Sequence, residues 1–239
     1  MAEAYYMQLT RQLREQLRYG GATWVDEVGR LPAERVLAER FNTTRVTLRQ
    51  ALAQLEGEGK IHRSNRRGWF VSPKRLEYDP TRDAGFNDYV TAQGRTPRTE
   101  VLGVTTATCP AAASALGLDV NHPLYHIRRR RYVDERAVLV ESLWVVPEQA
   151  PGLLQERFDH SLWGLLRERW QLELSHRSIR MVSEALQQDD ASELGVATGT
   201  AGLNISRTIF DTRHRPIEYD EEHWLHDALS IRVELSNTT

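Results

Sequence analysis

The stretch that decides the fold of the first part of the chain is Thr44-Arg-Val-Thr-Leu-Arg-Gln-Ala-Leu52. Its apolar residues, with one just beyond it, recur at the spacing of a single helical face: Leu48, Ala51, Leu52 and Leu55. Thr44 is of a residue type that caps helix N-termini, and Gly59 is of the type that ends helices. The sequence therefore predicts a helix capped by Thr44 and stopped by Gly59.

Two further helices are predicted upstream of this segment. The first is closed by Gly20-Gly21 and carries apolar residues at helical spacing, namely Tyr6, Leu9, Leu13 and Leu17. The second opens at Pro32, because proline is favoured in the first turn of a helix, and it runs to Phe41.

Downstream of Gly59 the pattern changes from helix to strand. The runs Lys60-Ile-His-Arg63 and Gly68-Trp-Phe-Val-Ser72 flank the basic segment Ser64-Asn-Arg-Arg67. This order predicts a β-hairpin with a basic tip. Three helices followed by a hairpin make a winged helix, which is the fold we expect for residues 1–72.

The helix after Thr44 leaves polar side chains uncovered once its apolar face is buried. Arg45, Thr47 and Arg49 lie on or beside the outward face near its N-terminal end, the part of a recognition helix that reaches base edges. Arginine can bond both guanine acceptors in the major groove. The basic residues of the hairpin are expected at the phosphate backbone or in the minor groove: Arg63, Arg66 and Arg67.

The charge of the chain is unevenly distributed along its length. Residues 1–76 hold 14 Lys and Arg against 8 Asp and Glu, whereas the remainder holds 17 against 25. A basic head on an acidic body suits a protein that holds a polyanion at one end. Taken alone, this pattern also fits a helical bundle with a basic solvated face.

Motifs in this region resemble the DNA-binding domain of the GntR family of bacterial regulators: Leu31-Pro-Ala-Glu-Arg35, Leu37-Ala-Glu-Arg-Phe41, Thr44 to Leu52, and Arg67-Gly-Trp-Phe-Val71. The resemblance covers residues 5 to 72. It implies contacts to DNA from Arg35, Thr44, Arg45, Thr47 and Arg49. It also implies that Gly68 lets the wing approach the duplex closely.

Residues 73–85 are predicted to form a linker, since they contain Pro73 and Pro80, end in Gly85 and show little apolar periodicity. Residues 86–239 then form a second domain with an internal repeat. Leu116-Gly117, Ile127, Arg129 and Glu141 are echoed 77 or 78 residues later by Leu194-Gly195, Ile205, Arg207 and Glu218. The pattern of each copy predicts a helix, a strand, a turn and a second strand, in that order. Two such halves predict one antiparallel sheet, with a cleft between them.

The run Arg128-Arg-Arg-Arg131 lies in the first predicted strand of this repeat. Because side chains alternate along a strand, Arg129 and Arg131 share one face, and Arg128 and Arg130 share the other. Two guanidinium groups about 7 Å apart could clamp a phosphate, phosphonate or carboxylate. The alternative is that all four arginines are solvated on an edge strand.

Looser motifs in residues 86 to 235 resemble the UTRA effector domain of the HutC branch of the GntR family: Gly94-Arg-Thr-Pro97, Leu116-Gly-Leu118, Arg129-Arg-Arg131, Ser161-Leu-Trp163 and Arg215-Pro-Ile-Glu-Tyr219. The resemblance implies an α+β protein whose second domain has a chorismate-lyase-like fold. It also implies that Arg129, Arg131 and Ser161 bind the anionic end of a small effector, and that Trp163 and Glu218 line the rest of the site.

A narrower set of motifs resembles the regulators of 2-aminoethylphosphonate use: Phe41-Asn-Thr-Thr-Arg45, Arg66 to Pro73, Arg75-Leu76, Asp79-Pro-Thr81 and Gln93-Gly94. That ligand fits the chemistry, with the arginine pair for the phosphonate and an acid for the ammonium group. The candidate acids are Glu141, Glu218 and Asp220, each of which could equally be a surface charge.

Two other classes of protein compete with a regulator. An enzyme related to the lyases is disfavoured because no catalytic triad spacing, metal-ligand cluster or glycine-rich phosphate loop is found, so we expect no metal and no cofactor. The only lysines, Lys60 and Lys74, lie outside the second domain and exclude a pyridoxal phosphate site there. An architectural DNA-binding protein would leave the acidic second domain unexplained.

The sequence thus predicts a DNA-binding transcriptional regulator. We expect a repressor and a homodimer on palindromic operator DNA, controlled by a small anionic effector such as 2-aminoethylphosphonate, a sugar phosphate or a carboxylate. No apolar run approaches the length of a membrane span and no signal segment is recognisable, so a cytoplasmic location without a membrane partner is expected.

Overall fold

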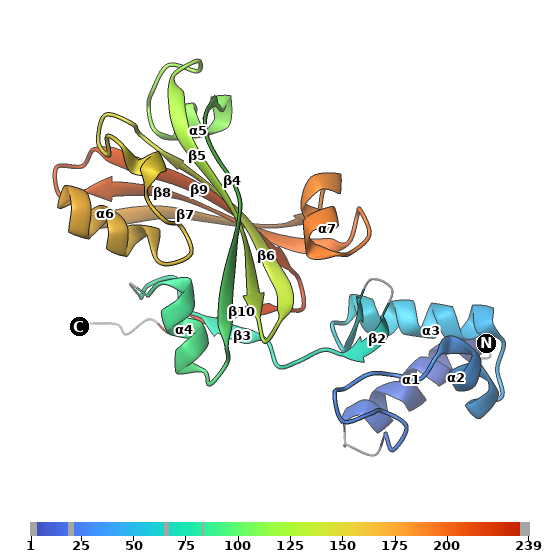
Figure 1. Ribbon diagram of the computed structural model, residues 1–239. Coiled ribbons are helices and arrows are strands. Elements are labelled where there is room, and N and C mark those ends of the chain that lie inside the picture. Colours follow the sequence, from blue (N-terminus) through green and yellow to red (C-terminus); the bar gives the residue numbers. More distant parts are fainter. Residues whose placement is uncertain (1–3, 19–21, 65–66, 83, 235–239) are drawn as a thin grey trace, which may run out of the picture. The chain divides into compact units, whose positions relative to one another are not determined.

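The computed structural model describes residues 4–18, 22–64, 67–82 and 84–234 of the chain. The chain forms two compact units, Met1–Arg75 and Leu76–Thr239, which are described separately below (Figure 1). In the described residues, no helix is long and apolar enough to cross a membrane.

The described part of the first unit is a winged helix, as the sequence predicts. It contains helices α1 (Tyr5–Arg18), α2 (Glu34–Arg40) and α3 (Arg45–Gly57), followed by strands β1 (Ile61–Ser64) and β2 (Gly68–Val71), which pair antiparallel. Its core joins residues from all these elements, among them Leu13, Leu37, Leu48, Ile61 and Trp69. Burial of this shared apolar surface holds the short helices and the hairpin together.

The helix expected from the decisive segment is confirmed in detail. The Thr44 hydroxyl accepts a hydrogen bond from the backbone N–H of Thr47 at 3.1 Å and so caps α3. Gly59 follows the helix with a φ of +69°, a conformation that glycine adopts without strain. The predicted apolar face is fully buried: Leu48, Ala51, Leu52 and Leu55.

Helix α2 is shorter at its N-terminal end than the sequence predicts. Helix α2 begins at Glu34, two residues after the predicted start at Pro32, and it ends at Arg40 with Phe41 as its C-cap. The preceding chain is still extended, because the Leu31 N–H donates to the Trp69 carbonyl at 2.8 Å alongside the wing. Helix α1 ends at Arg18, and the predicted stop at Gly20-Gly21 lies outside the described residues.

The second unit is built on a six-stranded antiparallel sheet of order β4-β5-β6-β9-β8-β7 (Figure 1). The strands are β4 (Pro97–Thr108), β5 (Pro123–Val133), β6 (Arg136–Val145), β7 (Leu174–Ala185), β8 (Ala201–Asp211) and β9 (Pro216–Leu225). The helices are α4 (Phe86–Ala92), α5 (Pro110–Ala115), α6 (Leu162–Trp170) and α7 (Gln188–Leu194), with a 3₁₀ turn η1 (Leu153–Gln155). The whole protein is therefore of the α+β class.

The predicted repeat is visible as two halves, β4-α5-β5-β6 and β7-α7-β8-β9, which meet where β6 pairs with β9. One predicted correspondence is wrong. Arg129 pairs with Glu141 across β5 and β6, and Arg207 pairs with Asp220 across β8 and β9. The counterpart of Glu141 is thus Asp220, while Glu218 stands opposite Ile209.

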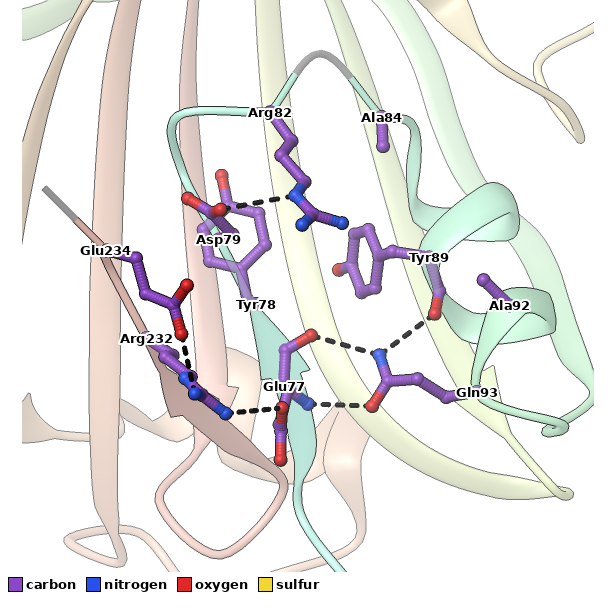
Figure 2. Close-up of a pocket in the computed structure, with 10 residues that line it drawn as sticks. All are labelled: Glu77, Tyr78, Asp79, Arg82, Ala84, Tyr89, Ala92, Gln93, Arg232 and Glu234. Atoms are coloured by element: carbon purple, nitrogen blue, oxygen red, sulfur yellow. Dashed lines mark hydrogen bonds and ion pairs between the residues drawn. The ribbon is translucent and has the colours of Figure 1, made fainter. Parts of the chain in front are cut away.

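The predicted linker also differs from the structure. Leu76–Tyr78 forms strand β3, which pairs parallel with β10 (Leu229–Ile231), and the Leu76 and Tyr78 side chains are buried. The Gln93 side chain extends this pairing: its amide nitrogen donates to the Glu77 carbonyl at 2.9 Å and its oxygen accepts from the Glu77 N–H at 2.8 Å (Figure 2). Residues 76–78 therefore belong to the second unit.

Gly202 on β8 offers a test of packing in this unit. An added Cβ would lie 2.9 Å from Leu186 Cδ2 and 3.0 Å from the Trp224 carbonyl oxygen, and both residues are almost fully buried. We expect Gly202→Ala to lower the free energy of unfolding by about 1–3 kcal/mol, through overpacking. Urea denaturation measures this, with Gly103→Ala on β4 as the control, since nothing lies within 4 Å of its Cβ position. Equal stability of both variants would contradict the packing described.

Candidate DNA-binding surface and effector cavity

The N-terminal end of α3 brings four of the predicted DNA-binding residues to one place. A shallow hollow there is lined by Arg35, Thr44, Arg45 and Thr47, together with Tyr5 and Asn42. The Thr44 and Thr47 hydroxyls lie 2.9 Å apart. Arg45 is exposed and has no side-chain partner among the described residues, so its guanidinium is available to a nucleic acid.

The two other arginines that the sequence predicts to contact DNA from α2 and α3 are already paired with acids. Arg35 forms an exposed ion pair with Glu39, one turn further along α2, at 2.7 Å. Arg49 lies outside the hollow, and its Nε donates to Glu34 Oε2 at 2.6 Å. Glu34 also accepts from the Trp69 indole at 3.2 Å. The pKa of Glu34 lies below its usual value: partial burial raises it, but these two hydrogen bonds outweigh that effect.

The wing carries basic side chains over its aromatic residues. The Arg67 guanidinium carbon lies 5.5 Å from the centre of the Phe70 ring, and that of Arg63 lies 5.9 Å from the Trp69 ring. Gly68 has a φ of +100°, which only glycine adopts without strain. Arg66, also predicted to contact DNA, lies outside the described residues.

A cavity of about 390 Å³ in the second unit brings together all the residues predicted to bind the effector: Arg129, Arg131, Glu141, Ser161, Trp163 and Glu218. Strands β5, β6, β7, β8 and β9 supply part of its lining, and α4, α6, β3 and the segment after β3 supply the rest. Because β6 and β9 come from different halves of the repeat, the cavity draws on both.

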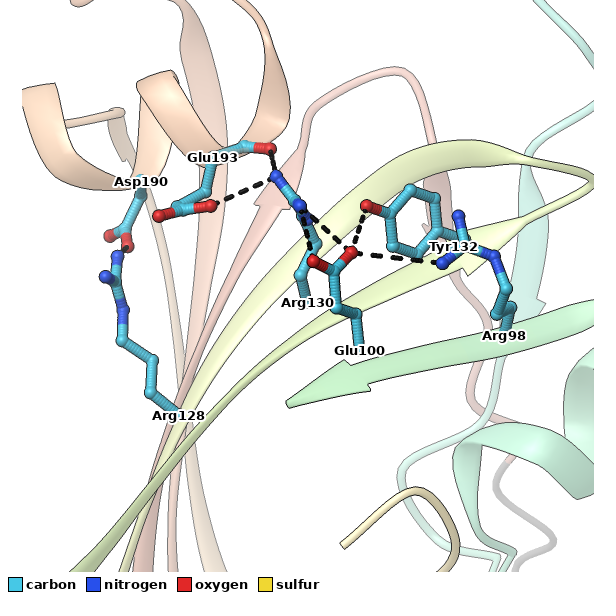
Figure 3. Close-up of polar contacts among 7 residues, drawn as sticks. All are labelled: Arg98, Glu100, Arg128, Arg130, Tyr132, Asp190 and Glu193. Atoms are coloured by element: carbon cyan, nitrogen blue, oxygen red, sulfur yellow. Dashed lines mark hydrogen bonds and ion pairs between the residues drawn. The ribbon is translucent and has the colours of Figure 1, made fainter. Parts of the chain in front are cut away.

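The arginine run divides between the two faces of the sheet as strand alternation predicts. Arg128 pairs with Asp190 of α7 at 2.7 Å, and Arg130 pairs with Glu193 of α7 and with Glu100 of β4 at 3.0 and 2.9 Å (Figure 3). Arg129 and Arg131 line the cavity on the other face. The alternative of an edge strand is wrong, since β5 lies between β4 and β6.

Glu141 holds the cavity arginines together. Its Oε1 lies 2.6 Å from Arg129 Nε and also pairs with Arg131 Nε, and all three side chains are almost fully buried. Arg129 further donates to the carbonyls of Phe158 and His160, and Arg131 to the Thr99 hydroxyl. Burial alone would raise the pKa of Glu141, but the two guanidinium groups bring it below its usual value. Glu141 is therefore an ionised partner of the arginines.

Glu218 stands in a different environment. Its side chain is buried, and its Oε2 has no hydrogen-bond partner in the part of the chain that the structure describes. Burial raises the pKa of Glu218 well above its ordinary value, and the nearby Asp220 raises it further against the effect of Arg207. Burial likewise raises the pKa of Asp220 to about 7, although Arg207 opposes this shift. The buried environment of Glu218 therefore favours its neutral form.

Helix α6 adds a site for negative charge. Its N-cap residue Ser161 accepts a hydrogen bond from the Gly164 N–H at 3.2 Å, and residues 161–165 all line the cavity. The first amides of a helix have no partners within it, and the helix dipole favours an anion at this end. Ser161 and Trp163 thus lie where an anion can be received.

Sequence reasoning missed part of the lining. Arg207 donates to Asp220 at 3.0 Å and to the Tyr78 hydroxyl at 2.9 Å, and it also pairs with Glu222. The repeat marked Arg207 as the counterpart of Arg129, so it could have been included. Tyr78 could not have been identified in this way, because it follows the first unit directly and the sequence around it predicts a linker. It also lines an adjoining pocket of about 600 Å³ (Figure 2).

Two sequence families match the chain. The profile of the gntR family of bacterial regulatory proteins matches residues 6–71, and that of the UTRA domain matches residues 92–230. These ranges contain the α3 surface and most of the cavity lining. The second match alone spans more than half of the chain.

Individual relatives agree with this assignment. The chain is 30% identical over 212 residues to the HTH-type transcriptional regulator YihL of Escherichia coli K12, covering 87% of this chain and 89% of YihL. It is 28% identical over 207 residues to the HTH-type transcriptional repressor NagR of Bacillus subtilis, covering 86% and 84%.

The fold also matches the crystal structure of PhnF from Mycobacterium smegmatis, with a TM-score of 0.67 and 22% identity over 96% of this chain and 99% of PhnF. The two relatives found by sequence similarity are regulators of transcription and not enzymes. The chain therefore belongs to the GntR family of bacterial regulators, as a transcriptional regulator with an N-terminal DNA-binding domain and a UTRA domain.

Proposed function

We propose that this regulator is a homodimeric repressor that leaves a palindromic operator when a small zwitterionic effector with an anionic end binds its cavity. The effector we favour is 2-aminoethylphosphonate. The observation that carries this proposal is the coexistence, in one cavity, of an anion-binding group and a buried carboxyl group without a partner. The alternative effector is a sugar phosphate or a carboxylate metabolite.

The anionic end is assigned to α6 and the cavity arginines. Helix N-termini bind phosphate-like groups through their free amides, and arginine bonds such groups in charge-assisted pairs. Glu141 contacts Nε of each arginine, and Nη1 already donates to Phe158 and His160 from Arg129 and to Thr99 from Arg131, so Nη2 of each arginine is the nitrogen assigned to the anion. Ser161 contributes its hydroxyl at the helix cap.

The amino end is assigned to Glu218. A buried carboxyl group without a hydrogen bond is costly, and an ammonium group placed beside it would satisfy it. Glu141 is less suited, because both arginines already neutralise it. Asp220 is less suited as well, because its carboxylate accepts from Arg207 at 3.0 Å. A sugar phosphate could offer Glu218 a hydroxyl donor, whereas an ammonium group would offer both a donor and a positive charge, so we favour the zwitterion.

The repressor assignment is supported by NagR, which is named a transcriptional repressor. Dimerisation is proposed because one α3 surface reads only one half-site, and a twofold protein matches a palindrome. We assign base or phosphate contacts to Arg35, Thr44, Arg45, Thr47 and Arg49, and wing contacts to Arg66, Arg67 and Gly68. The effector acts because it binds the DNA-bound and the DNA-free states of the protein with different affinities.

Removing Arg45 should impair DNA binding. The probe is an operator selected by the unmodified protein from a random duplex library. We expect Arg45→Ala to weaken binding about 10- to 100-fold, because an arginine pair to guanine is worth about 1–3 kcal/mol. Gel retardation at 150 mM salt measures the change. Arg213→Ala, an exposed arginine of the second unit, should bind normally with two chains per operator. Unchanged binding by Arg45→Ala would refute the assigned surface.

Glu218 should set the preference for an amine. Isothermal titration should show that 2-aminoethylphosphonate binds more tightly than ethylphosphonate, which has no amine. The hydrogen bond to a charged group is worth about 1.5–3 kcal/mol, so Glu218→Gln should lose roughly 10-fold or more of this preference. Arg157→Ala, at an exposed position, is the control. If a sugar phosphate binds and neither phosphonate does, the alternative effector replaces the proposed one.

Binding of the amine should also release a proton. Burial raises the pKa of Glu218 in the empty cavity and so favours its neutral form, whereas a nearby ammonium group favours its ionised form. Affinity should therefore rise with pH until Glu218 ionises without ligand. Titration at pH 7 in buffers of different ionisation enthalpy measures the proton release. The same titration with ethylphosphonate measures the protons that the phosphonate group itself exchanges, and this amount is subtracted. The same release by Glu218→Gln would assign the proton elsewhere.

A further inference from the structure

Glu34 joins three elements of the DNA-binding domain through one carboxylate. It lies in the first turn of α2, its Oε2 accepts from Arg49 Nε on α3, and its Oε1 accepts from the Trp69 indole on β2. The Glu34 side chain is 21% exposed, whereas that of Arg49 is 67% exposed. The inner end of this contact is thus fixed in the protein, and the outer end extends into solvent.

The contact with Glu34 leaves the two terminal nitrogens of Arg49, Nη1 and Nη2, available to bond a base. A guanidinium group has five donors in a planar fork, and guanine presents two acceptors that the terminal pair of nitrogens can bond. Glu34 contacts only Nε, and no described residue bonds Nη1 or Nη2 of Arg49. Holding Nε fixes the plane of the group and points the terminal pair outward.

The other two arginines of this surface lack such support. Arg45 has no side-chain partner among the described residues. Arg35 pairs with Glu39 on its own helix, and both side chains are about two-thirds exposed. Only the Arg49 contact crosses from one helix to another and continues to the wing. An arginine oriented before binding loses less side-chain freedom when it meets a base.

We propose that Glu34 is the positioning residue that sets the orientation of Arg49 for reading one base pair and ties that orientation to the wing through Trp69. This inference rests on the proposed role of Arg49 in operator binding. It assigns to Glu34 no contact with DNA of its own. Its effect therefore appears as discrimination at the base pair that Arg49 reads.

The test measures affinity for the selected operator and for a set of duplexes in which each base pair is changed in turn. Arg49→Ala should lose discrimination at one position of each half-site. Glu34→Ala should lose discrimination at the same position, by about tenfold, and should leave the position affected by Arg45→Ala unchanged. In the Arg49→Ala background, Glu34→Ala should have no further effect on that position.

Controls separate positioning from stability. Glu39→Ala removes a carboxylate from the same helix and should retain discrimination at the Arg49 position. Trp69→Phe removes the indole hydrogen bond but keeps the Arg49 pair, so it should lower the melting temperature and should reduce discrimination at the Arg49 position less than Glu34→Ala does. If Glu34→Ala fails to fold, Glu34→Gln, which keeps an acceptor for Trp69 but removes the charge, should show the same positional loss.

The outcomes distinguish this inference from the proposed function. If the unmodified protein selects no operator, the proposed function fails. If it selects an operator and Arg49→Ala relaxes one position while Glu34→Ala and Glu34→Gln do not, only the role of Glu34 is refuted. An equal loss of affinity for every duplex in the Glu34 variants would also refute it, because that result indicates a general structural role.

Discussion

The second domain depends on the neutralisation of four consecutive arginines in an inner strand. Removing charged groups from water is costly unless each is paired and hydrogen-bonded. The sheet meets this requirement differently on its two faces. Acids of α7 and β4 neutralise Arg128 and Arg130, whereas Glu141 alone is shared by Arg129 and Arg131. On the cavity face, no described residue accepts from Nη2 of Arg129 or of Arg131, and the proposed effector site lies on that face.

The DNA-binding domain illustrates a related principle on a smaller scale. Its helices are short, so packing of the shared apolar core supplies most of their stability. That core fixes α2, α3 and the wing relative to one another within the unit. A few polar contacts between these elements, such as those of Glu34, can then determine how individual side chains are presented. The apolar core thus fixes the positions of the elements, and the polar contacts on the surface determine how individual side chains are presented.

The elements that the sequence predicted well are those with local signals. The cap at Thr44, the apolar face of α3, the glycine after it and the hairpin all depend on residues within a few positions of one another. The six residues predicted to bind the effector also line one cavity. Strand β3 was missed because three residues carry too little pattern and its partner β10 lies at the other end of the domain. The pairing of Glu34 with Arg49 and Trp69, and the register of Glu218, depend on tertiary contacts that no local pattern encodes.

The two halves of the sheet share one order of elements but differ at positions near the cavity. Pairing across each half matches Arg129 and Glu141 with Arg207 and Asp220, but it also matches Arg131 with Ile209 and Leu139 with Glu218. A perfect duplicate would present the same groups twice and would suit a molecule with identical ends. The second half has an aliphatic side chain, Ile209, where the first has the cation Arg131, and an acid, Glu218, where the first has Leu139, so the two halves present different groups. Under the proposed function, this asymmetry lets a zwitterionic effector bind in one orientation and disfavours the reverse orientation.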